Sequence, residues 1–244
     1  IHNFEIYLLT VAHCCPNTAT KILKLFKTIT LYGRRHGFLS HDPFVNKRFH
    51  TQDSNRGFLT DEEIQRIIGK EISIPRLDLV RDIFIFSCFS GLAYIDVSNL
   101  TEDNIVELDG REWIMTRRQK TRVATNIILL DIPKRIIEKY APVRKNGHLL
   151  PILSNQKMNA YLKEIADLCN IRKPLSFHMA RHTFATMSLS KGVPIESVSK
   201  MLGHTNIKTT QIYARITNKK IEQDMLKLSD KLDIFRSPVS QAKQ

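Results

Sequence analysis

The sequence predicts a mainly α-helical fold with a small antiparallel three-stranded sheet, an α+β arrangement. Apolar residues recur at helical spacing through most of the 244 residues. The exception is the stretch "NIVELDGREWIMTRRQKTRVATNIILL", in which apolar residues alternate and Asp109-Gly110 is a strong hairpin signal. A second reversal around Gln119–Arg122 adds the third strand.

The first part of the chain is expected to be helical. Residues 4–12 show a short helical pattern, and residues 17–36 a longer one that ends where Gly37 can act as a C-terminal cap. The apolar stripe of the longer helix is predicted to contain Ile22, Leu25, Phe26 and Ile29. After the turn signal Asp42-Pro43, the polar and basic run "NKRFHTQDSNRGF" is typical of a linker, and we place a boundary near residue 55.

A second unit begins at "LTDEEI". Thr60 as N-cap and Glu63 three residues later form a capping box, which predicts a helix over residues 60–70. Pro133 and Pro194 stand where first-turn prolines occur, and Gly192 and Gly203 stand where helices stop. Further helices are expected at residues 76–90, 133–140, 155–169, 177–190, 194–202, 206–214 and 217–232.

The composition favours a polyanionic partner. The chain has 37 Lys and Arg against 24 Asp and Glu, a formal net charge of +13. Such an excess is most often found in proteins that bind nucleic acid, although some basic proteins have no such partner. The helix at residues 17–36 carries several of these charges on a face that is either simply solvated or able to follow a phosphate backbone.

Other sequence features narrow the class of protein. No apolar run approaches the roughly 20 residues that span a bilayer, so no membrane association is expected. Cys14, Cys15, Cys88 and Cys169 show no metal-ligand spacing, so we expect reduced core thiols of a cytoplasmic protein, with no metal and no zinc. Nothing resembles a signal peptide, and the opening "IHNFEIYLL" without methionine suggests that an N-terminal region is missing.

Three separated stretches carry polar residues suited to one anionic ligand. In "HMARHTFAT", His178, Arg181 and His182 share a helix face, where the planar fork of Arg181 can bind a phosphate. Taken alone this pair is weak evidence, because His182 could equally be a hydrogen-bonded core histidine. In "MLGHTNIKTTQIYAR", His204 follows Gly203 directly, and Tyr213, otherwise a buried aromatic, becomes a candidate nucleophile if cations surround its hydroxyl.

With Lys120 in the turn of "RRQKTR", these motifs in this order and spacing resemble the catalytic domain of the tyrosine recombinase (phage-integrase) family. Their wording is similar to integrases of Bacteroides-type conjugative transposons and other mobile elements. The resemblance implies a part of a helical core-binding domain at residues 1–50, a linker at 51–58, and the catalytic domain with a C-terminal tail helix at 59–244.

The resemblance also implies the chemistry. Tyr213 is expected to attack a DNA phosphodiester and form a 3′-phosphotyrosyl link, while Arg181 and His204 hold the phosphate. His178 is expected to act in acid–base transfer at the tyrosine, and Lys120 to protonate the leaving 5′-oxygen. Neither a metal nor ATP, nor any other cofactor, is implied. Recombination results when the phosphotyrosyl-linked 3′-end is rejoined to the 5′-end of a different strand.

One position departs from the family pattern. Where the family has its first arginine, the stretch "FSGLAYIDVSNLT" has Ala93. Asp96 stands at the position of the family's usual acidic residue. Losing such a phosphate ligand costs about 3–4 kcal/mol of transition-state stabilisation. Side chains two apart on a strand face the same way, so Arg118 is in phase with Lys120 and is our candidate substitute. A backbone-phosphate contact or a solvated side chain is the alternative role for Arg118. If no other arginine substitutes, the protein is expected to be a weak or inactive recombinase.

The partner expected from the resemblance is double-stranded DNA with paired recombination sites, bound by a homotetramer. In the C-terminal tail, Ile221, Met225, Leu228 and Leu232 form an apolar stripe that packs either in its own domain or on a neighbouring protomer. The side chains expected to contact DNA outside the catalytic cluster are Lys21, Lys24, Lys27, Arg34, Arg35, Lys47, Arg48, Arg117 and Arg122.

Two alternatives remain open from the sequence. In "VPIESVSKMLGHTNIKTTQIYA", a short Gly-His-Thr turn between two helices resembles a helix-turn-helix, which would make the chain a non-catalytic DNA-binding protein. A type IB topoisomerase uses similar tyrosine chemistry on a related fold. A covalent protein–DNA adduct would distinguish an enzyme from the first alternative, and a need for paired sites would distinguish a recombinase from the second.

Overall fold

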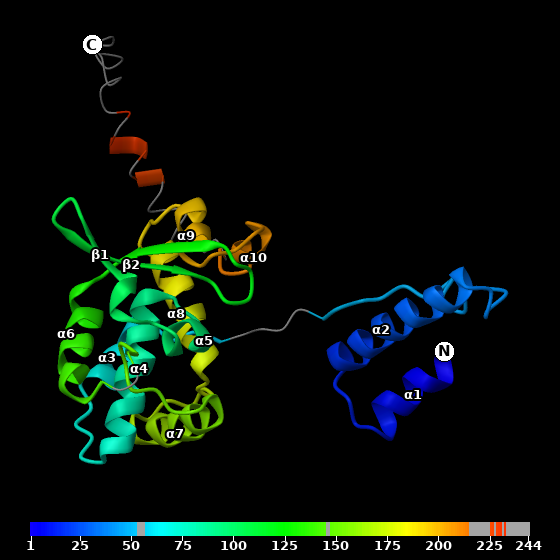
Figure 1. Cartoon of the computed structure of the whole chain (residues 1–244), viewed down its shortest axis with the longest axis horizontal. Helices are drawn as coiled ribbons and strands as arrows, with labels where there is room; N and C mark the ends of the chain where they lie inside the picture. The colour runs from blue at the N-terminus through cyan, green and yellow to red at the C-terminus, as the bar shows by residue number, and fades with distance from the viewer. Residues whose placement is uncertain (53–56, 145–146, 215–224, 227, 231, 233–244) are drawn as a thin grey trace, which may run out of the picture. The chain divides into compact units, whose positions relative to one another are not determined.

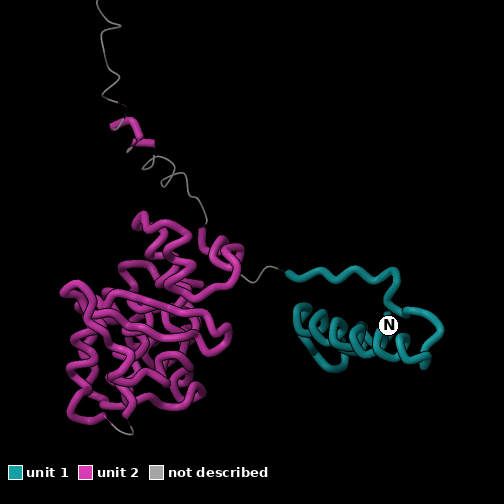
Figure 2. The backbone as a smooth tube through the Cα atoms, turned by 45° about the horizontal axis from the view of Figure 1, so that its top comes forward, with its two compact units in different colours: residues 1–55 teal, residues 56–244 magenta. Residues whose placement is uncertain are grey.

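The chain forms two compact units in a computed structural model that describes residues 1–52, 57–144, 147–214, 225–226, 228–230 and 232. The units comprise residues 1–55 and 56–244 (Figure 2). Within the described residues, no helix is both long enough and apolar enough to cross a membrane.

The first unit consists of α1 (His2–Thr10), α2 (Pro16–Arg35) and an extended segment that follows them. Its buried side chains are Leu8, Ala19, Leu23 and Phe44. The extended segment runs along α2, because the side-chain amide of Asn17 exchanges two hydrogen bonds of 2.9 Å with the backbone of Gln52. Part of the polar run expected to be a linker is therefore docked on α2.

The apolar stripe predicted for α2 is partly wrong. Ile22 and Phe26 pack against the small core, but Leu25 and Ile29 are 59% and 66% exposed. The buried face of α2 instead includes Ala19, Leu23 and Thr30. The reason is tertiary: α1 and the segment around Phe44 pack on that adjacent face, and helical spacing alone does not say which of two neighbouring apolar stripes they cover.

The second unit is built around α4 (Pro75–Ser90), which contacts α3, α6, α7 and α8 (Figure 1). Apolar side chains on all sides of α4 are buried, as expected for a helix surrounded by others. The capping box of Thr60 and Glu63 forms as predicted at the start of α3. The helices that complete the unit are α3 (Asp61–Ile68), α5 (Tyr94–Ser98), α6 (Asp131–Tyr140), α7 (Asn155–Leu168), α8 (Phe177–Ser190), α9 (Ile195–Met201) and α10 (Lys208–Gln211), with 3-10 turns at Glu102–Asn104 and Ala141–Val143.

The predicted three-stranded antiparallel sheet is confirmed, with strand order β1-β2-β3. Its strands are β1 (Ile105–Leu108), β2 (Arg111–Arg117) and β3 (Ala124–Ile128). Asp109 and Gly110 have φ of 50° and 70°, the left-handed pair that a tight two-residue hairpin requires. One side of the sheet meets the helices, since Ile114 and Ile127 are paired across β2 and β3 and both are buried.

The region around the last predicted helices differs from expectation. The helix expected over residues 206–214 is limited to α10, because the chain continues with tighter i to i+3 hydrogen bonds, from Tyr213 N to Thr210 O and from Ala214 N to Gln211 O. Most of the predicted helix over 217–232, with Ile221, lies outside the described residues. Of its apolar stripe, Met225, Leu228 and Leu232 are described and are exposed.

The cysteine prediction is correct for two residues and wrong for the others. All four cysteines are free, and Cys88 and Cys169 are buried as predicted. Cys14 is only partly buried and Cys15 is exposed. Cys15 is the N-cap of α2, where its Sγ lies 3.1 Å from the Thr18 hydroxyl, so it faces the first turn of the helix and not the core.

Gly91 has very little space beside its backbone. It is the C-cap of α4, with φ of 68°. A Cβ atom there would lie 2.4 Å from Cδ1 of the buried Phe184, in α8. Gly110 has nearly the same φ of 70° but open space around the missing Cβ. Replacing Gly110 therefore tests backbone strain alone, whereas replacing Gly91 tests the same strain together with steric overlap.

We predict that Gly110→Ala lowers the free energy of unfolding by about 1–2 kcal/mol, the cost of a left-handed alanine. Gly91→Ala carries the same strain and adds the overlap with Phe184, about 1–3 kcal/mol more. Urea unfolding of both variants checks the difference. Equal midpoints would show that α4 and α8 do not approach as closely as described.

Candidate active site

The side chain of Arg181 joins three helices. It comes from α8 and is 2% exposed. Its Nη1 donates a hydrogen bond of 2.7 Å to the carbonyl of Gly91, and its Nη2 donates to the carbonyl of Leu202. Gly91 and Leu202 are the C-caps of α4 and α9, whose terminal carbonyls carry partial negative charge. The guanidinium is thus held by two helix ends. Among the described residues these are its hydrogen-bond partners, so its other N–H groups can serve a ligand.

Burial and a neighbouring arginine act on the pKa of Arg181 in the same direction. Burial lowers the pKa of Arg181 to about 10, and the charge of Arg118 lowers it further in the same direction, against the opposite influence of Tyr213 and Asp96. Arg181 therefore stays protonated at neutral pH. A buried cation beside another cation is stabilised when an anion binds between them.

Two histidines and Tyr213 form a chain of ring contacts. The rings of His178 and His182, one helical turn apart on α8, lie 4.6 Å apart in an edge-to-face arrangement. The His182 ring is in turn 5.0 Å from the ring of Tyr213. His178 is exposed, His182 is buried, and Tyr213 is partly buried. The structure thus places Tyr213, the candidate nucleophile, against the face of α8 that carries His178 and His182.

His204 is positioned by the turn between α9 and α10. Gly203, with φ of 59°, ends α9 and directs the chain so that His204 Nδ1 shares a hydrogen bond of 2.8 Å with the Thr210 hydroxyl. With Nδ1 engaged, Nε2 is the nitrogen available to a substrate. Burial lowers the pKa of His204 to about 4, and the charges of Arg181 and Arg118 act in the same direction. His204 is therefore neutral at neutral pH.

The loop between β2 and β3 is attached at two points. The backbone N–H of Gln119 donates a hydrogen bond of 2.8 Å to the buried carboxylate of Asp96, in α5. The hydroxyl of Thr121 donates one of 3.0 Å to the carbonyl of Gly203. Lys120 lies between these two attachments and is exposed. The loop thus presents an ammonium beside the turn that carries His204.

Arg118 lies against Gly203. A Cβ atom built on this glycine would be 3.3 Å from Arg118 Cβ and 2.6 Å from Thr125 Oγ1. The charge of Arg118 acts on both Arg181 and His204. Among the described residues, Arg118 Nε is buried without a hydrogen-bond acceptor. The aligned position of the family's first arginine, Ala93, is the N-cap of α5.

The side chains expected to contact DNA outside this cluster are more dispersed. Arg117 and Arg122 are exposed at the ends of the loop, and Arg117 does not share the environment of Arg118. In the first unit, the Nζ atoms of Lys24 and Lys27 lie 5.9 and 5.8 Å from the centroid of the Phe49 ring. Lys21, Arg34, Arg35 and Arg48 are exposed, and Lys47 forms an ion pair with Glu5.

Several groups in the site had no sequence signal. The hydrogen-bond acceptors of Arg181 are backbone carbonyls. Since every residue has a backbone carbonyl, the sequence does not indicate which ones Arg181 contacts. Thr121 and Thr210 act through hydroxyls whose partners, Gly203 and His204, follow no motif spacing. His182 was visible in the sequence, but its packing against Tyr213, 31 positions later in the chain, was not.

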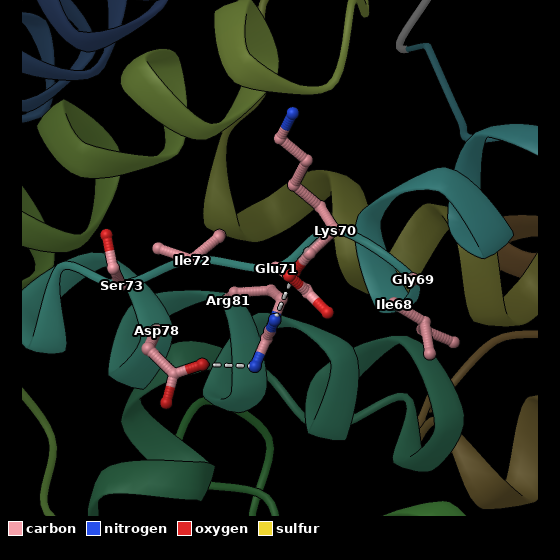
Figure 3. A pocket seen from close by; sticks show the side chains of 8 residues that line it. All are labelled: Ile68, Gly69, Lys70, Glu71, Ile72, Ser73, Asp78 and Arg81. Atoms are coloured by element: carbon pink, nitrogen blue, oxygen red, sulfur yellow. Dashed lines mark hydrogen bonds and ion pairs between the residues drawn. The ribbon is translucent and has the colours of Figure 1, made fainter.

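A hollow lies at the N-terminal end of α4, lined by the α3–α4 loop (Figure 3). Its charged groups satisfy one another. Arg81 donates to the carbonyl of Lys70 at 2.7 Å, to Asp82 at 2.9 Å and to Asp78, and the Tyr140 hydroxyl donates to Asp82 at 2.9 Å. These bonds fasten the loop and α6 to α4, which is a structural role. Within the described part of the chain, no group of three or more His, Cys, Asp or Glu residues could hold a metal ion.

Comparison with protein families gives one match. The model of the phage integrase family matches residues 58–220, about two thirds of the chain. Tyrosine recombinase XerD of Listeria monocytogenes is 26% identical over 226 residues, covering 85% of this chain and 74% of that protein. Tyrosine recombinase XerA of Thermococcus onnurineus is 31% identical over 169 residues, covering 65% of this chain and 58% of that protein.

Solved structures show the same fold. XerH site-specific recombinase bound to its palindromic difH substrate superposes with a TM-score of 0.71 at 17% identity, covering 92% of this chain and 70% of that one. The Tn1549 transposon integrase in complex with a circular intermediate DNA gives a TM-score of 0.69 at 15% identity, covering 93% and 84%.

We predict that His204 titrates with a midpoint near pH 4 in the folded protein and near its ordinary value of 6.5 in the urea-unfolded chain. Between these two values the unfolded state binds the extra proton, so this residue makes the fold less stable as the pH falls from about 6.5 to about 4. Imidazole chemical shifts followed by NMR check the midpoint. A folded-state midpoint at or above 6 would contradict the described environment.

Proposed function

The chain belongs to the phage integrase family, the tyrosine recombinases, and from that premise we propose that it is a site-specific DNA recombinase that cuts and rejoins DNA through a 3′-phosphotyrosyl intermediate. The observation that carries the proposal is the gathering of Arg181, His204 and Tyr213 around one positively charged site. Relatives named as tyrosine recombinases, and neighbours solved as recombinases on DNA, support it.

In the proposed reaction, the Tyr213 oxygen attacks the phosphorus of a DNA phosphodiester. A P–O bond to the tyrosine forms as the bond to the 5′-oxygen breaks, and His178 takes the tyrosine proton. Lys120, on its anchored loop, donates a proton to the leaving 5′-oxygen. Arg181 and the neutral His204 donate hydrogen bonds to the non-bridging oxygens. Because the phosphotyrosine conserves the energy of the broken bond, rejoining needs neither a metal nor ATP.

We propose that Arg118 takes the place of the arginine that is absent at Ala93. Three observations support this: its contact with Gly203, its electrostatic effect on Arg181 and His204, and a buried Nε that is free of protein acceptors within the described structure. A phosphate oxygen is the natural acceptor for such a group. The phosphate ligand and the proton donor Lys120 would then come from the same loop.

The remaining proposals concern partners and origin. We propose double-stranded recombination sites as the substrate, with the first unit as the C-terminal part of a core-binding domain and residues 51–58 as the linker. Residues 59–244 would be the catalytic domain, with a tail that joins protomers in a DNA-bound homotetramer. We propose a mobile element of the Bacteroides conjugative-transposon type as the source, for which the likeness to the Tn1549 integrase gives support only at the level of fold.

The proposal is tested with a nicked suicide duplex made from the end sequence of the element that carries the gene. We expect a covalent protein–DNA adduct in the presence of a metal chelator, because the nick lets the short 5′-fragment escape. Tyr213→Phe should bind the same DNA but form no adduct. A denaturing gel and a mobility shift measure the two steps. Binding by the wild-type protein without any adduct would favour a non-catalytic DNA-binding protein.

For Arg118 we predict that replacement by alanine slows adduct formation by about 100- to 1,000-fold, the usual cost of one donor to a developing oxyanion. Arg117→Ala is the matched control, because it removes an exposed arginine one position away. A second measurement is independent of activity: Arg118→Ala should raise the pKa of His204, whereas Arg117→Ala should not. An undiminished rate in Arg118→Ala would rule out the substitution.

A further inference from the structure

His182 has ring contacts with both the candidate base and the candidate nucleophile. The centroid of its ring lies 4.6 Å from that of His178 and 5.0 Å from that of Tyr213, and both contacts are edge-to-face. It is 3% exposed, so it is shielded from solvent although both of its ring neighbours are more accessible. The proposed chemistry gives no role to this residue.

Tyr213 lies in a short helical turn, with its backbone N–H bonded to the carbonyl of Thr210. It follows α10, which has only four residues, and a helix so short has no stability of its own. Its placement therefore depends on side-chain packing. Its ring packs against the apolar cluster that includes Phe184 and Leu202, and it also contacts the His182 ring. His182 is thus a polar side chain of α8 that packs against Tyr213, the proposed nucleophile.

We propose that His182 is a positioning residue, which holds the rings of Tyr213 and His178 in one ordered edge-to-face arrangement so that the tyrosine oxygen faces the phosphate. The role belongs to the flat ring and its packing and not to proton transfer by its nitrogens. This inference rests on the proposed function, since it takes Tyr213 as the nucleophile. It assigns a mechanical role to a histidine beside the arginine of the "HMARH" motif.

The test compares His182→Phe, which keeps a flat ring without nitrogens, with His182→Gln, which keeps polar atoms without a ring. Single-turnover adduct formation is measured at saturating suicide DNA, and affinity is measured by mobility shift. We expect His182→Gln to be slower by about 100-fold, the effect of a small misplacement of a reacting group, and His182→Phe to stay within about 5-fold of wild type. DNA affinity should change less than about 2-fold in both.

Phe177→Leu is the matched control for loss of a buried ring from α8. Phe177 packs against Phe84 and Tyr94, 6.4 and 5.6 Å away, and not against Tyr213. It should lower the melting temperature without a specific loss of rate. A His182→Phe variant as slow as His182→Gln would overturn the proposal and indicate a need for a ring nitrogen. A His182→Gln variant as fast as wild type would overturn it as well.

A readout that needs no activity separates this inference from the proposed function. The six tyrosines can be replaced by 3-fluorotyrosine, and Tyr213→Phe identifies the ¹⁹F signal of Tyr213. That signal should move towards the position of a solvent-exposed ring in His182→Gln and stay in place in His182→Phe and Phe177→Leu. An unmoved signal in His182→Gln overturns the inference even if wild-type protein forms the adduct. A moved signal supports it even if the adduct fails to form.

Discussion

The second unit depends on a buried guanidinium. Arg181 connects the C-terminal ends of α4 and α9 through hydrogen bonds to Gly91 and Leu202, so one side chain from α8 fixes the relative position of three helices. Burying a cation is costly unless its partners are good, and two helix ends supply both acceptors and favourable dipoles. Gly91 has to be glycine for the same reason, because its left-handed turn brings its carbonyl to Arg181 while Phe184 fills the space beside it.

The other parts of the site are attached to this framework in sequence. The carbonyl of Leu202 is held by Arg181, and Gly203 follows directly and receives the loop through Thr121. The neighbouring Gln119 is tied to Asp96. The loop is therefore fixed to α5 and to the end of α9, and Arg118 reaches the vicinity of Arg181 from this loop instead of from the position of Ala93. In the function we propose, the arginine absent at one end of α5 is supplied from the loop that Asp96 of the same helix anchors.

Local signals in the sequence predicted most of the elements but not their contacts. Asp109-Gly110 predicted the hairpin, because few residue pairs tolerate two positive φ angles. Thr60 and Glu63 predicted the start of α3, since their bonds lie within four residues. By contrast, Leu25 and Ile29 matched a helical stripe and are exposed, because the choice of face depends on distant residues. The partners of Arg181, Thr121 and His182 are likewise set only by the tertiary fold, which a motif indicates but does not specify.

The charge pattern fits the proposed phosphate site better than an ordinary DNA-binding surface. A helix-turn-helix protein gains by placing arginines where water screens them until DNA arrives. Here Arg118 acts on Arg181 and on His204 at close quarters, and it lowers the pKa of both. That repulsion reduces stability in the free protein, and within the described residues the nearby compensating carboxylate is the buried Asp96. Such an arrangement is less stable without an anion than with one. Preorganised stabilisation of a pentacovalent phosphate requires a site of this kind, because the free-energy cost of bringing the cations together is met in folding and not in the reaction.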